Sequence, residues 1–449
     1  MNRILLVAGT RPEVIKLSPL IKWLRKLKVD FIFVWSGQHY DYELSKVFFE
    51  KLGLPEPDIN LDIRSGSHSV QTAKAMVRLE KVISRFEPSL VVSEGDTNTV
   101  AAAALTAIKS HVPFAHVEAG LRSYDRTMPE EVNRIVADSC SELLFAPTEL
   151  AVANLMHEGI PLRKVHLTGN TVVDVVIEYK EKAKRRSIEL LEELKINPYE
   201  YLLITLHRQE NTDVSSNLLS IIKAVPVLSE RYEIVFPIHP RTQSKLKAGG
   251  MLNTLKRRGK LAVIPPQGYF EFLGLLSNSL TVLTDSGGVQ EETLTLGVPT
   301  VTLRCNTERP ETVLYGINVL AGTEPEAIVK LTENQVQRSE EIRKNLGKKP
   351  NPFGEGDAGE RITVVIKDAV ENGIEVEASD TRNDPYIVYV LIDSKRLQSI
   401  GKYKEGGFDI MTAYDLNGRP ILTQESLNYK GKIGKILVRA PLWMAKELQ

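Results

Sequence analysis

The segment ILLVAGTRPEVIKLSPLIKWLRKL, residues 4–27, carries the pattern that decides the fold. The apolar run Ile4 to Ala8 predicts a buried strand, and the polar loop GTRPE (9–13) follows it directly. Over residues 12–27 the large apolar side chains recur with the spacing of a helix that has one apolar face. A buried strand that leads into an amphipathic helix is the first half of a βαβ unit, the building block of parallel sheets.

The alternation of strand and helix continues along most of the chain, in two successive series. The predicted strands are residues 31–36, 90–94, 113–118, 143–147 and 165–169 in the first series, and 201–207, 233–239, 261–266, 280–285, 299–304 and 317–321 in the second. A charged helical segment, residues 177–195, separates them. We therefore predict an α/β fold with two doubly wound, Rossmann-like domains, residues 1–175 and 176–356.

After Gly373 the character of the sequence changes. A predicted helix, 357–372, ends there, and the polar segment 378–384 has the composition of a linker. Runs rich in β-branched and aromatic residues follow, with glycine-bearing turns, at 386–393, 408–414, 419–424 and 435–440. We expect a small antiparallel β-rich domain over residues 378–449, which is either a regulatory or assembly module or a stabilising appendage.

Composition narrows the class of protein. The 57 Lys and Arg balance the 57 Asp and Glu, so no general basic field indicates nucleic acid or an acidic membrane as partner. No apolar run is long enough to span a bilayer, and the start of the chain lacks the features of a secretory signal. The two cysteines, Cys140 and Cys305, lie too far apart in sequence to indicate a disulfide framework or a cysteine metal site. These features favour a cytoplasmic protein.

Polar clusters follow the strands of both series. They are GTRPE (9–13), EGDTNT (94–99), EAGLRS (118–123), HRQEN (207–211), PQGYF (266–270), TDSGG (284–288) and NTERPE (306–311). In open α/β sheets, ligands bind at the carboxyl ends of the strands. Seven such clusters therefore predict the walls of an interdomain cleft.

The loop after the first strand has one feature of an anion site. Pro12 suits the first helical position and leaves Arg11 to project beside free N–H groups; a surface arginine at a helix cap is the alternative. GTRPE is no dinucleotide fingerprint, because no G-x-G-x-x-G follows the strand and the second strand ends in SGQH rather than in an acid.

TDSGG carries a stronger phosphate signal. Ser286, Gly287 and Gly288 open a helix whose unpaired N–H groups and dipole favour an anion. Glu292, one turn further on, is suited to accept the hydroxyls of a ribose. The alternative is an ordinary tight turn with a solvated glutamate.

The candidates for proton transfer are Asp96, Glu118 and Glu130. Glu130 lies in the first turn of a predicted helix, where the helix dipole alone also favours a carboxylate. His207 ends a strand, where its imidazole can donate to a phosphate or move a proton; a lone histidine there is more often structural. His116, on a buried strand, is assigned a structural role. No His and acid pair has the spacing of a metal site, so we predict no tightly bound metal.

Seven motifs occur in a fixed order along residues 1–372: GTRPE, EGDT, HVEAGLRS, MPEEVNR, TLHRQEN, TDSGGVQEE and NTERPE. With these motifs in this order, the segment resembles the non-hydrolysing UDP-N-acetylglucosamine 2-epimerases. The resemblance implies the GT-B arrangement, in which the helix 357–372 crosses back to complete the first domain. It also implies interconversion of UDP-GlcNAc and UDP-ManNAc through elimination of UDP, a glycal intermediate and re-addition, with no cofactor. The expected partner is a UDP-sugar, and we expect a homodimer that binds neither nucleic acid nor membrane.

The resemblance also assigns roles to residues. The catalytic residues would be Asp96, Glu118, Glu130 and His207. The substrate would be bound by Arg11, Lys16, Gln267, Phe272, Ser286, Gly287, Gly288, Glu292 and Arg309. Gln267 and Phe272 lie where the family holds uracil, although Gly268 replaces a bulkier residue there.

Bacterial relatives also bind a second, activating UDP-GlcNAc. Gln38, Arg208 and His239 match positions of that allosteric site. Asp41 stands in place of a second glutamine, and residues 64–68 offer no clear counterpart of the remaining arginine. The incomplete match argues against allosteric activation.

Three other functions are compatible with the same fold. A hydrolysing epimerase would release free ManNAc and UDP, and a GT-B glycosyltransferase would use the same nucleotide site; EAGLRS with MPEEVNR argues against the transferase. A UDP-sugar sensor would use the tail as an interaction module. The presence of all three acids and of His207 argues against a sensor.

Overall fold

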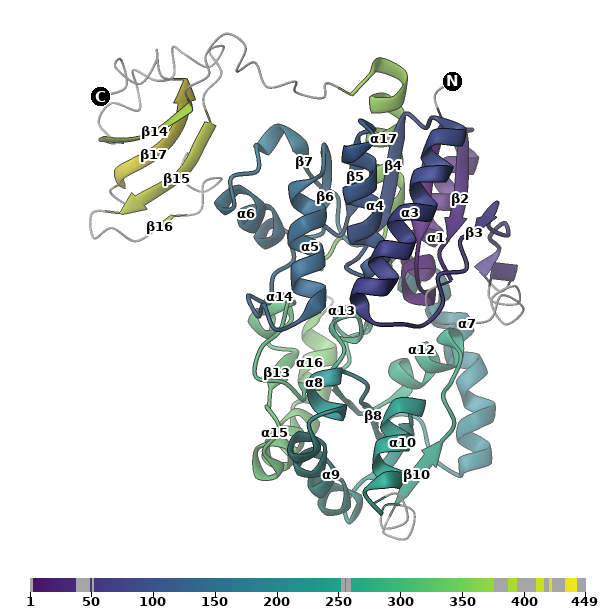
Figure 1. Ribbon diagram of the computed structural model, residues 1–449. Helices are drawn as coiled ribbons and strands as arrows, with labels where there is room; N and C mark the ends of the chain where they lie inside the picture. The colour runs from purple at the N-terminus through teal and green to yellow at the C-terminus, as the bar shows by residue number, and fades with distance from the viewer. Residues whose placement is uncertain are drawn as a thin grey trace.

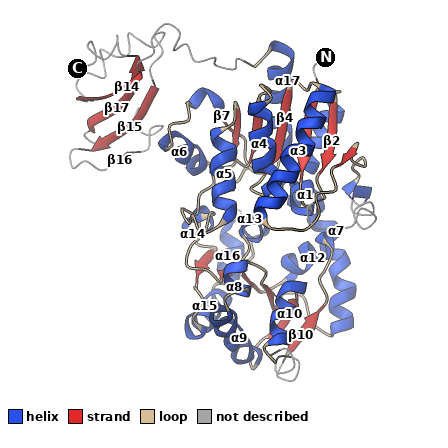
Figure 2. Cartoon of the chain, viewed as in Figure 1, coloured by secondary structure: helices blue, strands red, loops and turns tan. Residues whose placement is uncertain are grey.

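A computed structural model describes residues 3–37, 49–50, 52–251, 255, 260–346 and 348–374, together with four strands between residues 387 and 441. Two parallel sheets flanked by helices form the body of the chain, one above the other in Figure 1. Figure 2 shows the same division by secondary structure, with a separate group of strands near the C-terminus. The predicted α/β class with two doubly wound domains is confirmed.

The first sheet has the order β3-β2-β1-β4-β5-β6-β7 and is parallel throughout. Its strands are β1 (Ile4–Ala8), β2 (Phe31–Trp35), β3 (Ile59–Asn60), β4 (Leu90–Glu94), β5 (Phe114–Val117), β6 (Leu143–Ala146) and β7 (Val165–Leu167). The order reverses between β1 and β4, which is where ligands bind in this class of sheet. All five β1 residues are buried, as expected of a sheet covered on both faces.

The second sheet repeats this topology in the order β10-β9-β8-β11-β12-β13, also parallel. Its strands are β8 (Tyr201–Thr205), β9 (Glu233–Pro237), β10 (Leu261–Ile264), β11 (Thr281–Thr284), β12 (Thr300–Thr302) and β13 (Asn318–Leu320). Each lies within the corresponding run predicted from the sequence. Only the two-residue β3, which is too short to have a periodicity of its own, was not predicted.

Helices cover both faces of the sheets. They are α1 (Arg11–Lys26), α3 (His68–Phe86), α4 (Asn98–Lys109), α5 (Pro129–Ser139), α6 (Glu149–His157), α7 (Thr171–Leu194), α8 (Gln209–Thr212), α9 (Ser215–Ser229), α10 (Pro240–Ala248), α12 (Tyr269–Asn278), α13 (Gly287–Leu296), α14 (Pro310–Leu314), α15 (Pro325–Gln337), α16 (Ser339–Leu346) and α17 (Ala358–Asn372), with a 3₁₀ turn at Leu162–Lys164.

Alternate residues of β1 face opposite layers. Leu6 packs with α1 and α17, whereas Leu5 packs with α3 and α4.

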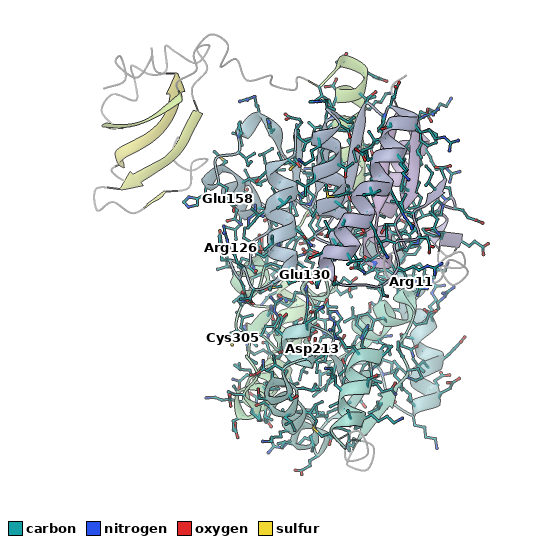
Figure 3. The ribbon with its side chains drawn as sticks, viewed as in Figure 1. Arg11, Arg126, Glu130, Glu158, Asp213 and Cys305 are labelled. Atoms are coloured by element: carbon teal, nitrogen blue, oxygen red, sulfur yellow. The ribbon has the colours of Figure 1, made fainter. Side chains whose placement is uncertain are left out.

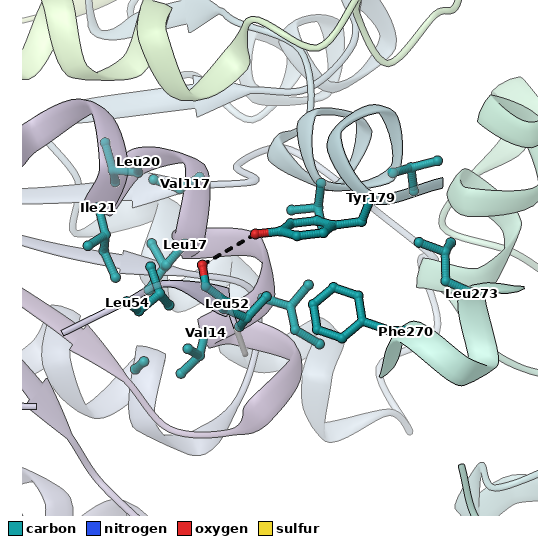
Figure 4. Close-up of a cluster of buried hydrophobic side chains, with 14 of the residues drawn as sticks. Val14, Leu17, Leu20, Ile21, Leu52, Leu54, Val117, Tyr179, Phe270 and Leu273 are labelled. Carbon is teal, nitrogen blue, oxygen red and sulfur yellow. Dashed lines mark hydrogen bonds between the residues drawn. The ribbon is translucent and has the colours of Figure 1, made fainter. Parts of the chain in front are cut away.

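Helix α7 joins the two halves. Its Tyr179 packs on Phe270 of α12, with ring centroids 4.8 Å apart, and its hydroxyl donates to the carbonyl of Leu52 at 3.3 Å. Figure 4 shows this cluster, in which α1, α7 and α12 contribute to one continuous core. The boundary proposed at residues 175 and 176 falls within the first turns of this helix.

Helix α17 crosses back onto the first domain, as the resemblance implied. The carboxylate of Asp174, near the start of α7, accepts the N–H groups of Ala358 and Gly359 at 3.2 and 2.9 Å and so caps α17. A Cβ on Gly359 would lie 2.6 Å from the Cβ of Pro19, so only glycine permits this approach to α1. Ile362 and Ile366 of α17 are fully buried in the shared core.

The C-terminal strands form a separate antiparallel sheet, which confirms the predicted β-rich character. They are β14 (Ile387–Asp393), β15 (Asp409–Asp415), β16 (Pro420–Ile421) and β17 (Ile433–Pro441), in the order β14-β17-β15-β16. In the described part of the chain, no helix is long and apolar enough to cross a membrane.

Candidate active site

The carboxyl ends of the two sheets face each other across the domain boundary. In Figure 3, Glu130 and Arg11 lie at the edge of the first domain that faces the second. Asp96 follows β4, Glu118 follows β5, and Glu130 occupies the first turn of α5. His207, Ser286 and Arg309 follow β8, β11 and β12 of the second domain. The predicted polar loops thus gather at one boundary because parallel strands in each sheet end on the same side.

Glu118 is held by charges from both domains. Its carboxylate pairs with Lys16 of α1, and it accepts from Arg309 Nη2 of the second domain at 2.7 Å and from Asn170 Nδ2 at 3.1 Å. The side chain is only 4% exposed. Burial alone would raise the pKa of Glu118, but Lys16 and Arg309 outweigh it and lower the pKa to about 2. Glu118 is therefore ionised at neutral pH.

Arg309 is the centre of the cross-domain contacts. Besides Glu118, its guanidinium binds Glu291 through Nε at 2.6 Å and lies 3.7 Å from Glu308 through Nη1. Burial raises the pKa of Glu291 to about 7, even though Arg309 opposes the shift. Burial also acts to raise the pKa of Glu308, but Arg208, Arg304 and Arg309 hold it well below the usual value. Nη1 of Arg309 has no hydrogen-bond partner among the described atoms.

Asp96 and Glu130 are more open than Glu118. Their side chains are 27% and 33% exposed, and each lies near one arginine. Arg134 Nη1 is 3.1 Å from Asp96 Oδ2, and Arg208 Nη1 of the second domain is 3.4 Å from Glu130 Oε1. These two acids therefore have free surface to offer a ligand at the boundary.

His207 lies on the opposite side of the boundary, next to a buried acid. Its Nδ1 is 3.6 Å from Asp285 Oδ1, and the side chain is 36% exposed. The carboxylate of Asp285 accepts the backbone N–H groups of His207 and Arg208 at 3.1 and 2.9 Å, which fixes the strand end. Desolvation lowers the pKa of His207 although Asp285 opposes it, so the imidazole is neutral at neutral pH and able to accept a proton.

The start of α13 has the geometry of an anion site. Ser286 is its N-cap residue, and the Ser286 N–H donates to Thr284 Oγ1 at 3.0 Å. A Cβ built on Gly287 would collide with Glu308, whereas one built on Gly288 meets no described atom within 4 Å. Gly288 therefore leaves room for a ligand beside the start of the helix, where the backbone N–H groups have no partner within the helix. Burial raises the pKa of Glu292, on the next turn, to about 7, with Tyr269 beside it.

The remaining predicted residues are less closely joined to this group. Arg11 begins α1 at the boundary, but the N–H groups of Gly9 and Thr10 beside it are not free, because the carboxylate of Glu13 accepts both. Gln267 is partly exposed, and its Nε2 donates to the carbonyl of Pro265 at 2.8 Å. Phe272 packs against the shared core at the start of α12.

Two of the three candidate allosteric residues lie near the site. Arg208 contacts Glu130, and the ring of His239 lies 6.0 Å from that of His207. Gln38 and Asp41 lie outside the described residues.

The structure adds buried partners that sequence reasoning did not single out. Glu94 is 3.1 Å from Lys16, Asp285 holds His207, and Glu291 and Glu308 hold Arg309. Each of these acids lies inside one of the sequence motifs given above, close in sequence to a residue that was predicted to belong to the site. Which of two adjacent acids, such as Glu291 and Glu292, faces the boundary depends on the helix rotation. Among the described residues, no group of three or more His, Cys, Asp or Glu side chains is arranged to hold a metal ion.

Comparison with known proteins identifies the family. The family model for UDP-N-acetylglucosamine 2-epimerase matches residues 22–367. The UDP-N-acetylglucosamine 2-epimerases of Methanocaldococcus jannaschii and Methanococcus maripaludis are each 45% identical, over 80% and 82% of this chain and 98% of theirs. A crystal structure of the M. jannaschii UDP-GlcNAc 2-epimerase in complex with UDP-GlcNAc and UDP superposes with a TM-score of 0.74, at 44% identity, over 81% of this chain and 99% of that one. The chain is therefore an enzyme of the UDP-N-acetylglucosamine 2-epimerase family.

Proposed function

We propose that this enzyme interconverts UDP-N-acetylglucosamine and UDP-N-acetylmannosamine without releasing free sugar. The observation that carries the proposal is that acids on the first domain and groups suited to bind an anion on the second domain meet at one boundary. Two partly exposed acids, Asp96 and Glu130, lie at the boundary on the first domain. On the second domain, Arg208 lies 3.4 Å from Glu130 and directly follows the neutral His207, and the start of α13 follows a neighbouring strand. Inversion next to the anomeric carbon requires proton transfer on one side and a site for a leaving diphosphate on the other.

The nucleotide would bind to the second domain. The N–H groups at the start of α13 would receive phosphate oxygens, since Gly288 leaves room for them. Glu292 would accept ribose hydroxyls, and the segment from Gln267 to Phe272 would hold uracil, as in the family pattern. Arg309 Nη1, which lacks a hydrogen-bond partner in the described chain, would donate to the nucleotide from the same side. Arg11 and Lys16 would approach the diphosphate from the first domain.

The reaction balances with no redox step. A base removes the proton from carbon 2, the electron pair forms the double bond between carbons 1 and 2, and the bond from carbon 1 to the UDP oxygen breaks. The pair from that bond leaves with UDP, whose charge is stabilised by the α13 N–H groups. An acid then returns a proton to carbon 2 on the opposite face, and the UDP oxygen bonds again to carbon 1.

The environments of the acids suggest how the work is divided. Asp96, in the loop after β4, and Glu130, in the first turn of α5, would exchange protons with carbon 2 from its two faces. Glu118 is held ionised by Lys16 and Arg309, so it is suited to stabilise positive charge near the sugar rather than to donate a proton. His207, whose imidazole is neutral, would donate its ring N–H to an oxygen of the departing diphosphate.

A product assay on UDP-GlcNAc tests the proposal and separates it from hydrolysis. We expect UDP-ManNAc to accumulate to an equilibrium mixture, with no free ManNAc and no net release of UDP. The same mixture should form when the reaction starts from UDP-ManNAc. Release of equal amounts of free ManNAc and UDP would assign the hydrolysing reaction instead. UDP-sugar binding without any product would indicate a sensor.

A further inference from the structure

A buried ion pair, His116 with Asp138, lies behind the three candidate acids. His116 is on β5 and Asp138 is on α5, and both side chains are essentially inaccessible to solvent. His116 Nδ1 and Asp138 Oδ1 are 2.6 Å apart. Because both side chains are closed off from solvent, neither offers a surface to a bound sugar.

This pair contacts the supports of all three acids. His116 Nε2 is 2.7 Å from the carbonyl of Gly95, the residue before Asp96. Asp138 Oδ2 accepts the N–H of Gly120, two residues after Glu118, at 3.1 Å. Asp138 also lies on α5, the helix whose first turn carries Glu130. One pair of side chains thus joins the β4 loop, the β5 loop and α5.

Each polar atom of the two side chains has a partner. The Asp138 carboxylate lies on one ring nitrogen of His116 and the Gly95 carbonyl lies on the other. Arg122 Nη2 lies 2.7 Å from Asp138 Oδ2. Burial opposes ionisation of Asp138, but His116 and Arg122 keep its pKa below the usual value. Charged hydrogen bonds of this kind are short and directional, which suits them to hold loops in place.

The loop that carries Glu118 needs such support. Glu118 has φ of 72° and Gly120 has φ of 83°, both in the left-handed region that is unfavourable for a side chain larger than glycine. The N–H groups of Glu118 and Ala119 share the carbonyl of Phe145, at 3.1 and 3.0 Å. The next anchor along the loop is the bond from Gly120 to Asp138. A strained conformation persists only where its surroundings over-determine it.

We propose that His116 and Asp138 are positioning residues that set the relative placement of Asp96, Glu118 and Glu130. The inference rests on the proposed function, because it concerns the geometry of the three acids to which that function assigns proton transfer and charge stabilisation. It changes the role assigned to His116 from the sequence, where it was only a buried structural residue. Misplacing a catalytic group by about 1 Å costs on the order of 10²-fold in rate.

Two substitutions test the pair, each made in the full chain. In Asp138→Asn, one amide oxygen cannot serve His116, Gly120 and Arg122 together. His116→Gln removes one of the two bonds that join Gly95 to Asp138. The matched control is Glu158→Gln, which removes a carboxylate 2.5 Å from Arg122 Nη2 at the outer end of the same network. Glu158 is 31% exposed, and in Figure 3 it lies above Glu130, on the side away from the second domain.

The measurements are kcat and KM for epimerisation, the Kd of UDP and the melting temperature. We expect kcat to fall by about 10²-fold in Asp138→Asn and His116→Gln, with the Kd of UDP within about threefold of wild type. Glu158→Gln should keep kcat within about twofold. An increase in KM with kcat unchanged would overturn the proposal. So would kcat values in the two test variants equal to that of Glu158→Gln. Loss of the fold in both test variants would also overturn it and assign a purely structural role. Absence of epimerisation by the wild type would instead contradict the proposed function.

Discussion

The carboxyl-terminal edges of the two parallel sheets meet at the domain boundary. The two edges have the same topology but present groups of opposite charge. Both follow the strands of sheets with the same topology. The first edge presents acids, Asp96, Glu118 and Glu130, whereas the second presents Arg208, Arg309 and the N-terminus of α13. The difference shows that one repeated architecture can present carboxylates on one domain and fixed positive charge on the other.

Neither edge is complete alone. Glu118 owes its low pKa partly to Arg309, and the only arginine paired with Glu130 in the described structure is Arg208; both arginines come from the other domain. Separation of the domains would therefore change the charge environment of both acids. Closure of the two domains is thus expected to assemble the catalytic group as well as to exclude water.

The largest effect is expected on the acid edge. Glu130→Gln removes a titratable group and keeps the side-chain size, so kcat should fall by about 10²–10⁴-fold, the usual worth of a positioned acid or base. The Kd of UDP should change little, because UDP is expected to bind the opposite edge. Steady-state kinetics with a separate UDP titration make both measurements.

Glu149→Gln is the matched control for this change. Glu149 also lies in the first turn of a helix, α6, where the dipole favours a carboxylate, but it is exposed and makes no described contact with the three acids. It should keep nearly full activity. Equal, small effects of both substitutions would mean that Glu130 serves only the helix dipole.

A smaller effect is expected on the nucleotide edge, and it depends on pH. Burial raises the pKa of Glu292 to about 7, and ribose hydroxyls donate to its ionised form. About a tenth of such a group is ionised at pH 6 and about nine tenths at pH 8, so UDP affinity should rise roughly tenfold across that range. The phosphate of free UDP also titrates in this range, but it contributes equally to the pH dependence of UDP affinity in the wild type and in any variant.

Glu292→Gln provides the comparison for the pH profile. The variant should bind UDP more weakly than the wild type at pH 8, and its affinity should lack the rise that Glu292 contributes. Isothermal titration at several pH values measures both. Parallel pH profiles for the two proteins would show that Glu292 does not bind the nucleotide.

The smallest effect concerns the C-terminal sheet. A chain that ends at Gly373 retains α17, whose Ile362 and Ile366 complete the shared core. It should fold and epimerise within about twofold of the full chain, since loop and tail changes outside the core are well tolerated. A chain that ends at residue 356 lacks α17 and should fail to fold. Soluble, UDP-binding but inactive protein ending at Gly373 would mean that the tail takes part in catalysis or closure.

The fold was more predictable than the site contacts. Strand positions follow from local apolar runs such as Ile4–Ala8, and the strand order follows from the rules for doubly wound sheets. The loops that meet were therefore predictable as well. The partners of the side chains were not predictable: the sequence did not indicate that Lys16 pairs with Glu94 and Glu118. Such pairs depend on helix rotation and on the approach of two domains, neither of which a local pattern contains.

His116 illustrates the same limit. Its place on a buried strand favoured a structural role, and only the contacts with Gly95 and Asp138 connect it to the acid loops. The left-handed conformation of Glu118 was equally hidden, because φ is not readable from a glutamate in a loop. Both features arise from contacts between segments that are distant in the sequence.

The most direct test of the account is turnover of UDP-GlcNAc in deuterated water, with no added nicotinamide, followed by NMR of carbon 2. Proton abstraction and return by side chains at the domain boundary predict deuterium at carbon 2 of both UDP-sugars, with none at the other ring carbons. Epimerised product without deuterium at carbon 2, or an absolute requirement for a nicotinamide, would contradict the account.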